Sequence, residues 1–249
     1  MSGLTRLGWT ALSLALLVAA WQIAAWLAAS RLLPGPAAVV EALHRAAEDG
    51  ALFRNIGVTL ARVAASFALA MALGSALGVL LGRRPALDRV VGPWVVVLLN
   101  LPALVIIILC YVWFGLTEVA AITAVAVNKI PNVAVTLREG AGALSRDLDE
   151  MAQLYRLGRW TRLRHVVLPQ LAPFFAAAAR SGLALTWKIV LVVELLGRSN
   201  GVGFELQTAF QLFDVAMVLA YALAFTAVVQ AIELGVLQPW ERRAARWRR

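Results

Sequence analysis

The segment Arg138–Pro173 decides the fold, because it is the longest polar interruption in an otherwise apolar chain; it reads REGAGALSRDLDEMAQLYRLGRWTRLRHVVLPQLAP. It contains six arginines and a cluster of three acids, so it is too charged to lie in lipid. Apolar residues recur along it at the spacing of one helix face, at Leu144, Leu148, Met151 and Tyr155. The pattern predicts short amphipathic helices that hang between membrane spans and present an apolar stripe to another surface.

The ends of these short helices are also marked in the sequence. Ser145 occupies an N-cap position, and acids in the first turn suit the positive end of the helix dipole. Gly158 is expected to end the first helix. A second helix is expected over 160–167 and should stop before Pro169. Lipid headgroups, the protein's own helices or a partner protein could receive the apolar stripe.

The composition defines an integral membrane protein. Hydrophobic residues make up 61% of the 249 residues and charged residues only 15%, with a mean hydropathy of +0.79. Soluble domains carry roughly 25% charged residues. The single Cys110 excludes an intrachain disulfide. The net charge of +9 is explained by basic cytoplasmic loops, so no nucleic-acid partner is inferred.

Six stretches are apolar and long enough to cross a bilayer, which takes about 20 residues. The expected spans are 7–29, 63–82, 91–115, 116–137, 171–197 and 215–237. The chain thus divides into a first transmembrane helix (1–30), an extracytoplasmic amphipathic connection (31–62), a five-helix core (63–240) with a polar loop at 138–170, and a basic tail (241–249). Gly74, Gly78 and Gly82 share one face of the second span and predict a close helix contact.

The distribution of basic residues orients these spans. With both termini in the cytoplasm, fifteen Lys and Arg residues fall on the cytoplasmic side and five on the outer side. This excess is the bias that sets the orientation of membrane proteins. The fold class expected is therefore all-α, with six transmembrane helices, a cytoplasmic helical hairpin and both termini inside.

The sequence carries no recognisable catalytic machinery. It lacks a G-x-x-x-x-G-K-[ST] nucleotide loop, and its only two lysines, Lys129 and Lys188, follow no such loop. It also lacks H-E-x-x-H and Cys/His metal patterns. We therefore expect no enzyme activity, no cofactor and no metal, and any ATP hydrolysis must come from another protein.

Polar and helix-breaking residues inside the spans are the candidates for a translocation path. They are Asn100, Pro102, Asn128, Lys129, Lys188 and Glu194. A cation at the bilayer centre costs roughly 2.5–3.5 kcal/mol, so it normally faces a bundle interior, an acid or water. Lys188, together with Asn100 and Asn128, is expected to favour an anionic solute. A structural bond of Lys188 to Glu118, or to Glu194 of a second subunit, is an equally good interpretation.

The polar loop resembles the EAA loop of permease subunits from ATP-binding-cassette (ABC) importers. That pattern reads E-A-A, three residues, G, nine residues, I-x-L-P. Here it aligns Glu150-Met151-Ala152 with E-A-A and Val166-Val167-Leu168-Pro169 with I-x-L-P. Two positions depart, since Met151 replaces the first alanine and Arg156 replaces the glycine. Gly158 is expected to supply the turn in its place.

The resemblance extends over some five-sixths of the chain to permeases of the nitrate, sulfonate and taurine importer group. Its motifs here are LPGP at 33–36, NIGVTLARVAASFALAMALGSALGVLLG at 55–82, VWFGL at 112–116 and VVELLGRSNGVGFEL at 192–206. It implies a homodimer in the bacterial inner (plasma) membrane, ABC ATPase subunits on the cytoplasmic side and an extracytoplasmic solute-binding protein. The residues implied for ATPase coupling are Glu150, Met151, Ala152, Tyr155, Arg156, Leu157, Gly158, Trp160, Leu168 and Pro169.

Two other classes stay open at this level. An ATPase-independent secondary transporter or channel is one, although the two halves show no evident inverted repeat. A non-transport membrane scaffold is the other, and it would leave the cations within the spans unexplained. The sequence does not name the solute.

Overall fold

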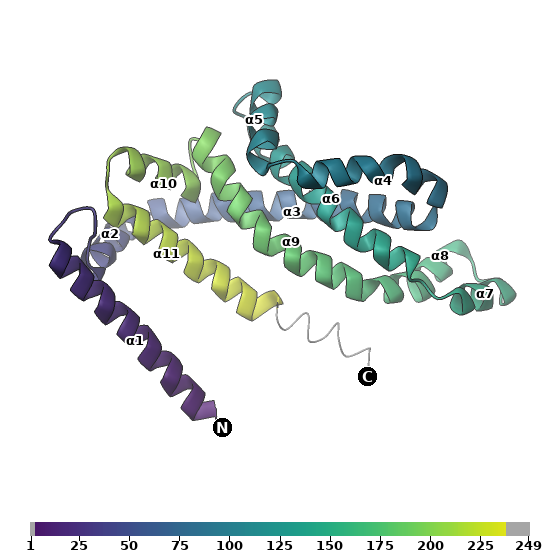
Figure 1. Cartoon of the computed structure of the whole chain (residues 1–249), viewed down its shortest axis with the longest axis horizontal. Helices are drawn as coiled ribbons and strands as arrows, with labels where there is room; N and C mark the ends of the chain where they lie inside the picture. The colour runs from purple at the N-terminus through teal and green to yellow at the C-terminus, as the bar shows by residue number, and fades with distance from the viewer. Residues whose placement is uncertain (1–2, 238–249) are drawn as a thin grey trace.

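The computed structural model describes residues 3–237 and shows an all-helical protein, as the sequence predicts (Figure 1). Its helices are α1 (Gly3–Ala28), α2 (Pro36–Glu48), α3 (Ala51–Arg83), α4 (Pro85–Asn100), α5 (Ala103–Phe114), α6 (Glu118–Gly142), α7 (Arg146–Leu154), α8 (Arg159–Arg162), α9 (Leu168–Gly197), α10 (Val202–Gln211) and α11 (Val215–Ile232), with π-helical turns η1 (Leu163–Val167) and η2 (Glu233–Leu237). The predicted tail at 241–249 lies outside the described residues.

Five helical segments of the described chain are long and apolar enough to cross a membrane. They are α1, α3, α6, the segment that runs from α8 into α9, and α11. The remaining predicted span, 91–115, contains Asn100 and Pro102 as helix-breaking residues in its middle, and the chain is broken at that place. The chain forms α4 and α5 there, bent by 98° at Leu101-Pro102, so the pair adds a sixth span only if it is counted as one. The proline and Asn100 mark the break in the sequence, but not its size.

Helix α3 is longer than the bilayer requires. Its 33 residues correspond to about 50 Å at 1.5 Å per residue, against a hydrocarbon core of about 30 Å. The helix begins at Ala51, twelve residues before the predicted span, and includes Arg54 and Arg62. Residues 51–62, which the sequence assigns to the outer connection, therefore form the N-terminal part of this membrane helix.

The glycine face of α3 packs against α6, which confirms the predicted helix contact. A Cβ atom added at Gly78 would lie 2.4 Å from the carbonyl oxygen of Ala134, and one at Gly82 would lie 2.5 Å from that of Arg138. Only glycine allows the two backbones to approach so closely. The contacts follow the same direction along both helices, since Gly78 meets Ala134 and Gly82 meets Arg138. Helices α3 and α6 are therefore parallel.

The segment after the hairpin is one unbroken helix, although the sequence predicts a stop before Pro169. Helix α8, the turn η1 and helix α9 continue without interruption over Arg159–Gly197, a length of 39 residues. Within η1 the backbone N–H of Leu168 reaches the carbonyl of Leu163, five residues back. This wider turn accommodates the proline ring, which would otherwise crowd the preceding turn.

Helix α6 lies at the centre of the bundle and packs against α3 and α9 (Figure 1). Helix α1 stands apart from this core and contacts α2 and the loop before it, where Nε1 of Trp21 donates to the carbonyl of Pro34 at 3.0 Å. Helices α7 and α8 project at one end of the long axis of the molecule, and α2 and α10 lie toward the other (Figure 1). The two ends are therefore joined mainly by α3, α6 and α9.

Candidate functional site

The first polar feature is the cytoplasmic hairpin, which we define as residues 145–162. The Ser145 hydroxyl accepts from the backbone N–H of Leu148 at 3.4 Å, so the predicted N-cap is confirmed. Arg162 of α8 donates two hydrogen bonds to Asp149 of α7, one of them at 3.0 Å. These bonds hold the pKa of the Asp149 carboxyl below its ordinary value. The backbone N–H of Ser145 also donates to Gln170 on α9 at 2.9 Å, so both arms are tied together and to the long helix.

The bend of the hairpin is made by Arg156 and not, as predicted, by Gly158. Arg156 has a φ of 51° in the left-handed region, directly after the last turn of α7. Its N–H donates to the carbonyl of Gln153, and the N–H of Leu157 donates to that of Ala152, both at 2.9 Å. This is the hydrogen-bond pattern of a Schellman C-cap, which favours glycine at the position that Arg156 occupies. Gly158 has a φ of −58° and begins α8.

The hairpin buries little of its own apolar surface. Ala152 is the one buried residue of α7. Leu154 is 81% exposed, and Tyr155 and Trp160 are each 72% exposed. Of the other residues implied for coupling, Glu150, Met151, Arg156, Gly158, Leu168 and Pro169 are exposed and Leu157 is half-buried. An aromatic and aliphatic patch at the end of a membrane protein is a typical protein-binding surface.

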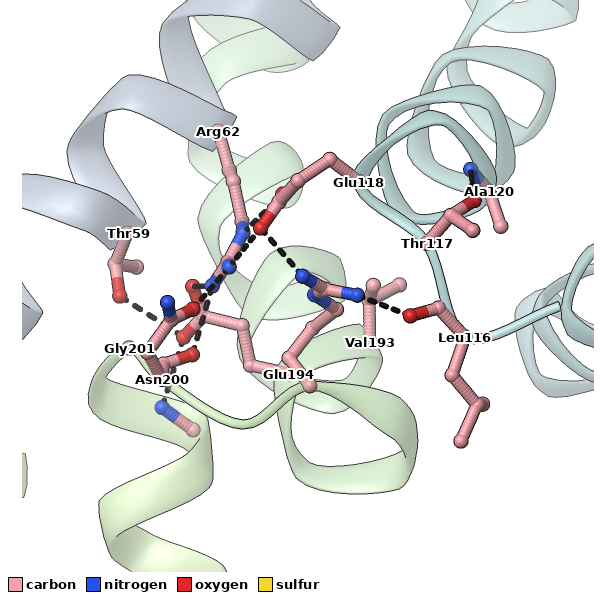
Figure 2. A network of polar contacts seen from close by, with 12 residues as sticks. Thr59, Arg62, Leu116, Thr117, Glu118, Ala120, Val193, Glu194, Asn200 and Gly201 are labelled. Atoms are coloured by element: carbon pink, nitrogen blue, oxygen red, sulfur yellow. Dashed lines mark hydrogen bonds and ion pairs between the residues drawn. The ribbon is translucent and has the colours of Figure 1, made fainter.

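The second polar feature, called here the outer network, is a cluster of hydrogen-bonded side chains that is buried at its centre (Figure 2). It joins α3, α6, α9 and the loop before α10 through Thr59, Arg62, Glu118, Glu194, Arg198 and Asn200. Arg62 is its centre, and its side chain is only 4% exposed. The guanidinium donates to Glu118 at 2.8 and 2.5 Å, to Glu194 at 2.7 Å and to the backbone carbonyl of Asn200 at 2.8 Å.

All five N–H groups of Arg62 are used, because the fifth donates to the side-chain oxygen of Asn200. Glu194 is completely buried, and its carboxylate also accepts from the hydroxyl of Thr59 and the N–H of Gly203, both at 2.9 Å. Buried charges are tolerated when they are paired and hydrogen-bonded in this way. The network therefore fixes three membrane helices to one another at one end.

Two glycines close the outer network. Gly201 has a φ of 105°, and a Cβ atom added to it would lie 2.4 Å from the carboxyl carbon of Glu194. A Cβ atom at Gly203 would lie 2.3 Å from the carbonyl oxygen of Leu191. The Gly201-Val202-Gly203 sequence is thus a turn, and it wraps the loop directly around the buried carboxylate.

The polar residues predicted within the spans do not form one cluster. Lys129 is 2% exposed inside the subunit, with its Nζ unpaired among the described residues and its Cε 3.2 Å from the site of a Cβ atom at Gly182. Lys188 is exposed on α9, Asn128 is half-buried, and Asn100 and Pro102 are exposed at the α4–α5 break. Glu118 and Glu194 are both paired with arginines of the same chain, so neither is a free partner for Lys188.

Sequence reasoning missed the outer network, although the sequence contained a signal for it. Arg62, Glu118, Glu194 and Arg198 are two charges of each sign at the predicted outer ends of three neighbouring spans. Their mutual pairing offsets part of the cost of placing charges at these helix ends. The two features together define a helical membrane protein in which an exposed hairpin at one end is joined by one continuous helix to a hydrogen-bonded ion-pair network at the other.

Comparisons with known proteins place the chain in a family. Residues 70–235 match the family of binding-protein-dependent transport system inner membrane components, and the chain belongs to that family. It is therefore the permease component of an ABC importer, located in the inner membrane, and is not itself an enzyme. The family resemblance inferred from the EAA-like loop is confirmed.

Individual relatives are similar over most of their length. The chain is 28% identical to SsuC of Bacillus subtilis, named for aliphatic sulfonate transport, over 99% of this chain and 90% of that one. It is 26% identical to the taurine permease TauC of Escherichia coli, covering 94% and 88% of the two chains. It is also 26% identical to the bicarbonate permease CmpB of Synechococcus elongatus, covering 88% and 84%.

The fold also matches a solved structure, described as an inward-facing conformation of the MetNI methionine ABC transporter. The TM-score is 0.66 at 20% sequence identity, with 79% of this chain and 97% of that chain covered. At this identity the likeness concerns the fold, and it confirms the predicted all-helical membrane class.

Proposed function

We propose that this permease subunit forms a homodimer that carries a small oxyanion across the membrane. In this proposal an ATPase binds the cytoplasmic hairpin, and an extracytoplasmic binding protein delivers the solute. The observation that carries the proposal is the continuous helix Arg159–Gly197, which begins in the hairpin and reaches the outer network through Glu194. A displacement of its cytoplasmic end by the ATPase would be transmitted across the membrane as the movement of one body.

The exposed patch of the cytoplasmic hairpin is the proposed ATPase contact. Leu154, Tyr155 and Trp160 are too exposed to stabilise the isolated subunit, and burying them against a partner would be favourable. Glu150 and Arg156 lie beside them and are exposed, so they are placed to fix the register with charged groups of the partner.

Lys188 supports transport of an anion. It lies nine residues before the end of α9, within the predicted span 171–197 and on an exposed position, where contact with lipid would cost roughly 2.5–3.5 kcal/mol. A second subunit or a water-filled path removes that cost, and the cation then attracts an oxyanion. Asn128 and Asn100 are also accessible and suit the same path. Lys129 and Glu194 are enclosed within the subunit, and we assign them structural roles.

The chemistry named for the relatives narrows the solute class. Aliphatic sulfonates, taurine and bicarbonate all carry a compact group in which two or three oxygens share a negative charge. Identities of 26% and 28% support that shared chemistry and do not single out one of the three.

The docking test uses the full chain co-expressed with its ATPase and binding protein. Tyr155→Ala combined with Trp160→Ala should reduce recovery of the ATPase with the permease at least tenfold and abolish uptake. Trp26→Ala on α1, where the tryptophan is 78% exposed, is the matched control and should change neither. Normal ATPase recovery by the hairpin variant would overturn the proposed contact.

The solute test measures ATP-driven uptake of labelled taurine, an alkanesulfonate and bicarbonate into vesicles containing the complete transporter. Lys188→Gln should reduce uptake of the transported anion at least tenfold without reducing ATPase recovery. Ala184→Gln, at an exposed position one turn earlier on α9, is the control for added polar bulk. Wild-type uptake by Lys188→Gln would remove the lysine from the path, and failure of all three solutes would reject the solute class.

A further inference from the structure

A groove on the surface of the helical bundle is not used by the proposed transport function. It lies between the cytoplasmic halves of α3 and α9 and has a volume of about 580 Å³. Its walls are almost entirely apolar and include Val79, Leu163, Leu168, Leu171 and Phe175. Leu168 is 51% exposed and Phe175 39% exposed, so the subunit itself leaves these side chains uncovered.

The groove has the depth of about one membrane leaflet. On α3 its lining runs from Ser75 to Arg83, which is eight residues or about 12 Å along the helix axis. Half of a hydrocarbon core of about 30 Å is about 15 Å. The groove thus begins at the level of the last turn of α3, which is predicted to face the cytoplasm, and extends toward the bilayer centre.

The mouth of the groove is basic. A second hollow shares Ala76, Val79 and Arg83 with the groove and adds Arg84, Arg162 and Asp149. The rim of the groove on this side therefore has three arginines, Arg83, Arg84 and Arg162, and one acid, Asp149. Asp149 is already engaged by two hydrogen bonds from Arg162, and it is 3.9 Å from Arg83. Arg83 and Arg84 are both exposed, so they remain available to an anion at the headgroup level.

We infer that this groove binds an anionic phospholipid of the cytoplasmic leaflet, with an acyl chain along the apolar walls and the phosphate between Arg83 and Arg84. Apolar clefts with basic mouths on the cytoplasmic side of membrane helices suit this class of ligand. The basic C-terminal residues 241–249, with five arginines and one acid, would be repelled by the same rim. The inference is independent of which solute the permease transports.

The lipid also has a consequence for the cytoplasmic hairpin. Arg83 lies on the rim beside Asp149, which joins α7 to α8 through Arg162. A phosphate bound to Arg83 would compete with Asp149 for that arginine. The lipid therefore sits where it can adjust how tightly the hairpin is held against α3.

The experiment measures lipid binding to the purified full-length permease by native mass spectrometry. Phosphatidylglycerol is compared with phosphatidylcholine of identical acyl chains. The wild-type chain should prefer phosphatidylglycerol. Arg83→Gln combined with Arg84→Gln should weaken phosphatidylglycerol binding about 25-fold, since each basic residue near anionic lipid contributes about fivefold. Arg89→Gln, which removes an exposed arginine on the adjacent helix α4, is the control and should change binding less than twofold.

A second variant tests the groove without altering charge. Ala172→Phe adds bulk at an exposed position of the lining and should weaken binding at least fivefold, and Ala76→Phe should do the same from the opposite wall. Equal losses in Arg89→Gln and the double variant would mean general surface attraction and overturn the site. Unchanged binding in both phenylalanine variants, or cross-linking of Ala76→Cys to a second copy of the chain, would show that the groove is not a lipid site.

Discussion

At the scale of single residues, Arg156 is the position where this chain departs most clearly from the importer pattern. A non-glycine residue in the left-handed region costs roughly 1–2 kcal/mol, and Arg156 adopts that conformation with a φ of 51°. The turn nevertheless keeps both hydrogen bonds of the Schellman pattern, which offset part of this cost. The exposed side chain of Arg156 is then free to contact the ATPase.

Arg156→Gly should stabilise the hairpin turn by about 0.5–1 kcal/mol. Glycine removes the Cβ penalty of the left-handed conformation, but the larger backbone entropy that it loses on folding offsets part of this gain. Hydrogen exchange at the amide of Leu157, which bonds to Ala152, is expected to slow accordingly. Gly158→Ala is the control, since Gly158 has ordinary torsions and the nearest neighbour of an added Cβ atom is 3.9 Å away. Faster exchange in Arg156→Gly would contradict this account of the turn.

Arg62 carries the second prediction at this scale. Arg62→Met leaves the fully buried Glu194 without its cation, and breaking such a pair typically costs about 3–5 kcal/mol. Thermal unfolding of the purified permease should shift to clearly lower temperature. Arg54→Met, an exposed arginine two turns earlier on α3, should leave the transition unchanged. Adding Glu194→Gln to Arg62→Met should recover part of the loss, whereas fully additive losses would argue against a coupled pair.

At the scale of elements, the spans were predictable because a bilayer imposes a minimum length of apolar sequence on each of them. The outer network was not, because its partners are distant in the chain: Arg62 is 56 residues from Glu118 and 138 from Asn200. Local patterns do not encode such pairings. The unbroken path through Pro169 was missed for a different reason, since a π-helical turn has no sequence signature comparable to the proline that argues against it.

The close contact between α3 and α6 can be tested by single substitutions of the glycines on α3. Gly78→Ala places a Cβ atom 2.4 Å from the carbonyl oxygen of Ala134, so the helices must separate, at an expected cost of about 1–3 kcal/mol in thermal stability. Gly57→Ala on the same helix has no atom within 4 Å of the added Cβ, and should be neutral or stabilise by up to about 1 kcal/mol. Similar effects at the two positions would mean that helix propensity, and not close packing, explains the glycines.

At the scale of the whole molecule, the fold separates the proposed ATPase contact from the outer network, which holds the helices together. Helices α7 and α8 of the cytoplasmic hairpin lie near the N-terminal end of α9 (Figure 1), and Glu194 of the outer network lies three residues before its C-terminal end. The turn η1 is the one change in helix type between them. A single long helix anchored by a buried ion-pair cluster is suited to pivot as a rigid body about that cluster. The alternative is that the wider π turn bends and absorbs the movement.

Spin labels distinguish these two possibilities in the assembled transporter. Cys110 is the one native cysteine and is buried, so Cys110→Ala provides a background for labels at Arg159→Cys, before η1, and Leu195→Cys, near the end of α9, both exposed. The labels are about 54 Å apart by helical rise. With one labelled chain diluted into unlabelled chains, ATP should leave this distance unchanged within about 2 Å, because the helix is continuous. A second pair, at His165→Cys and Leu80→Cys on α3, should change by several ångströms as α9 pivots. A shortened first distance would place the bend at η1 and reject the rigid lever.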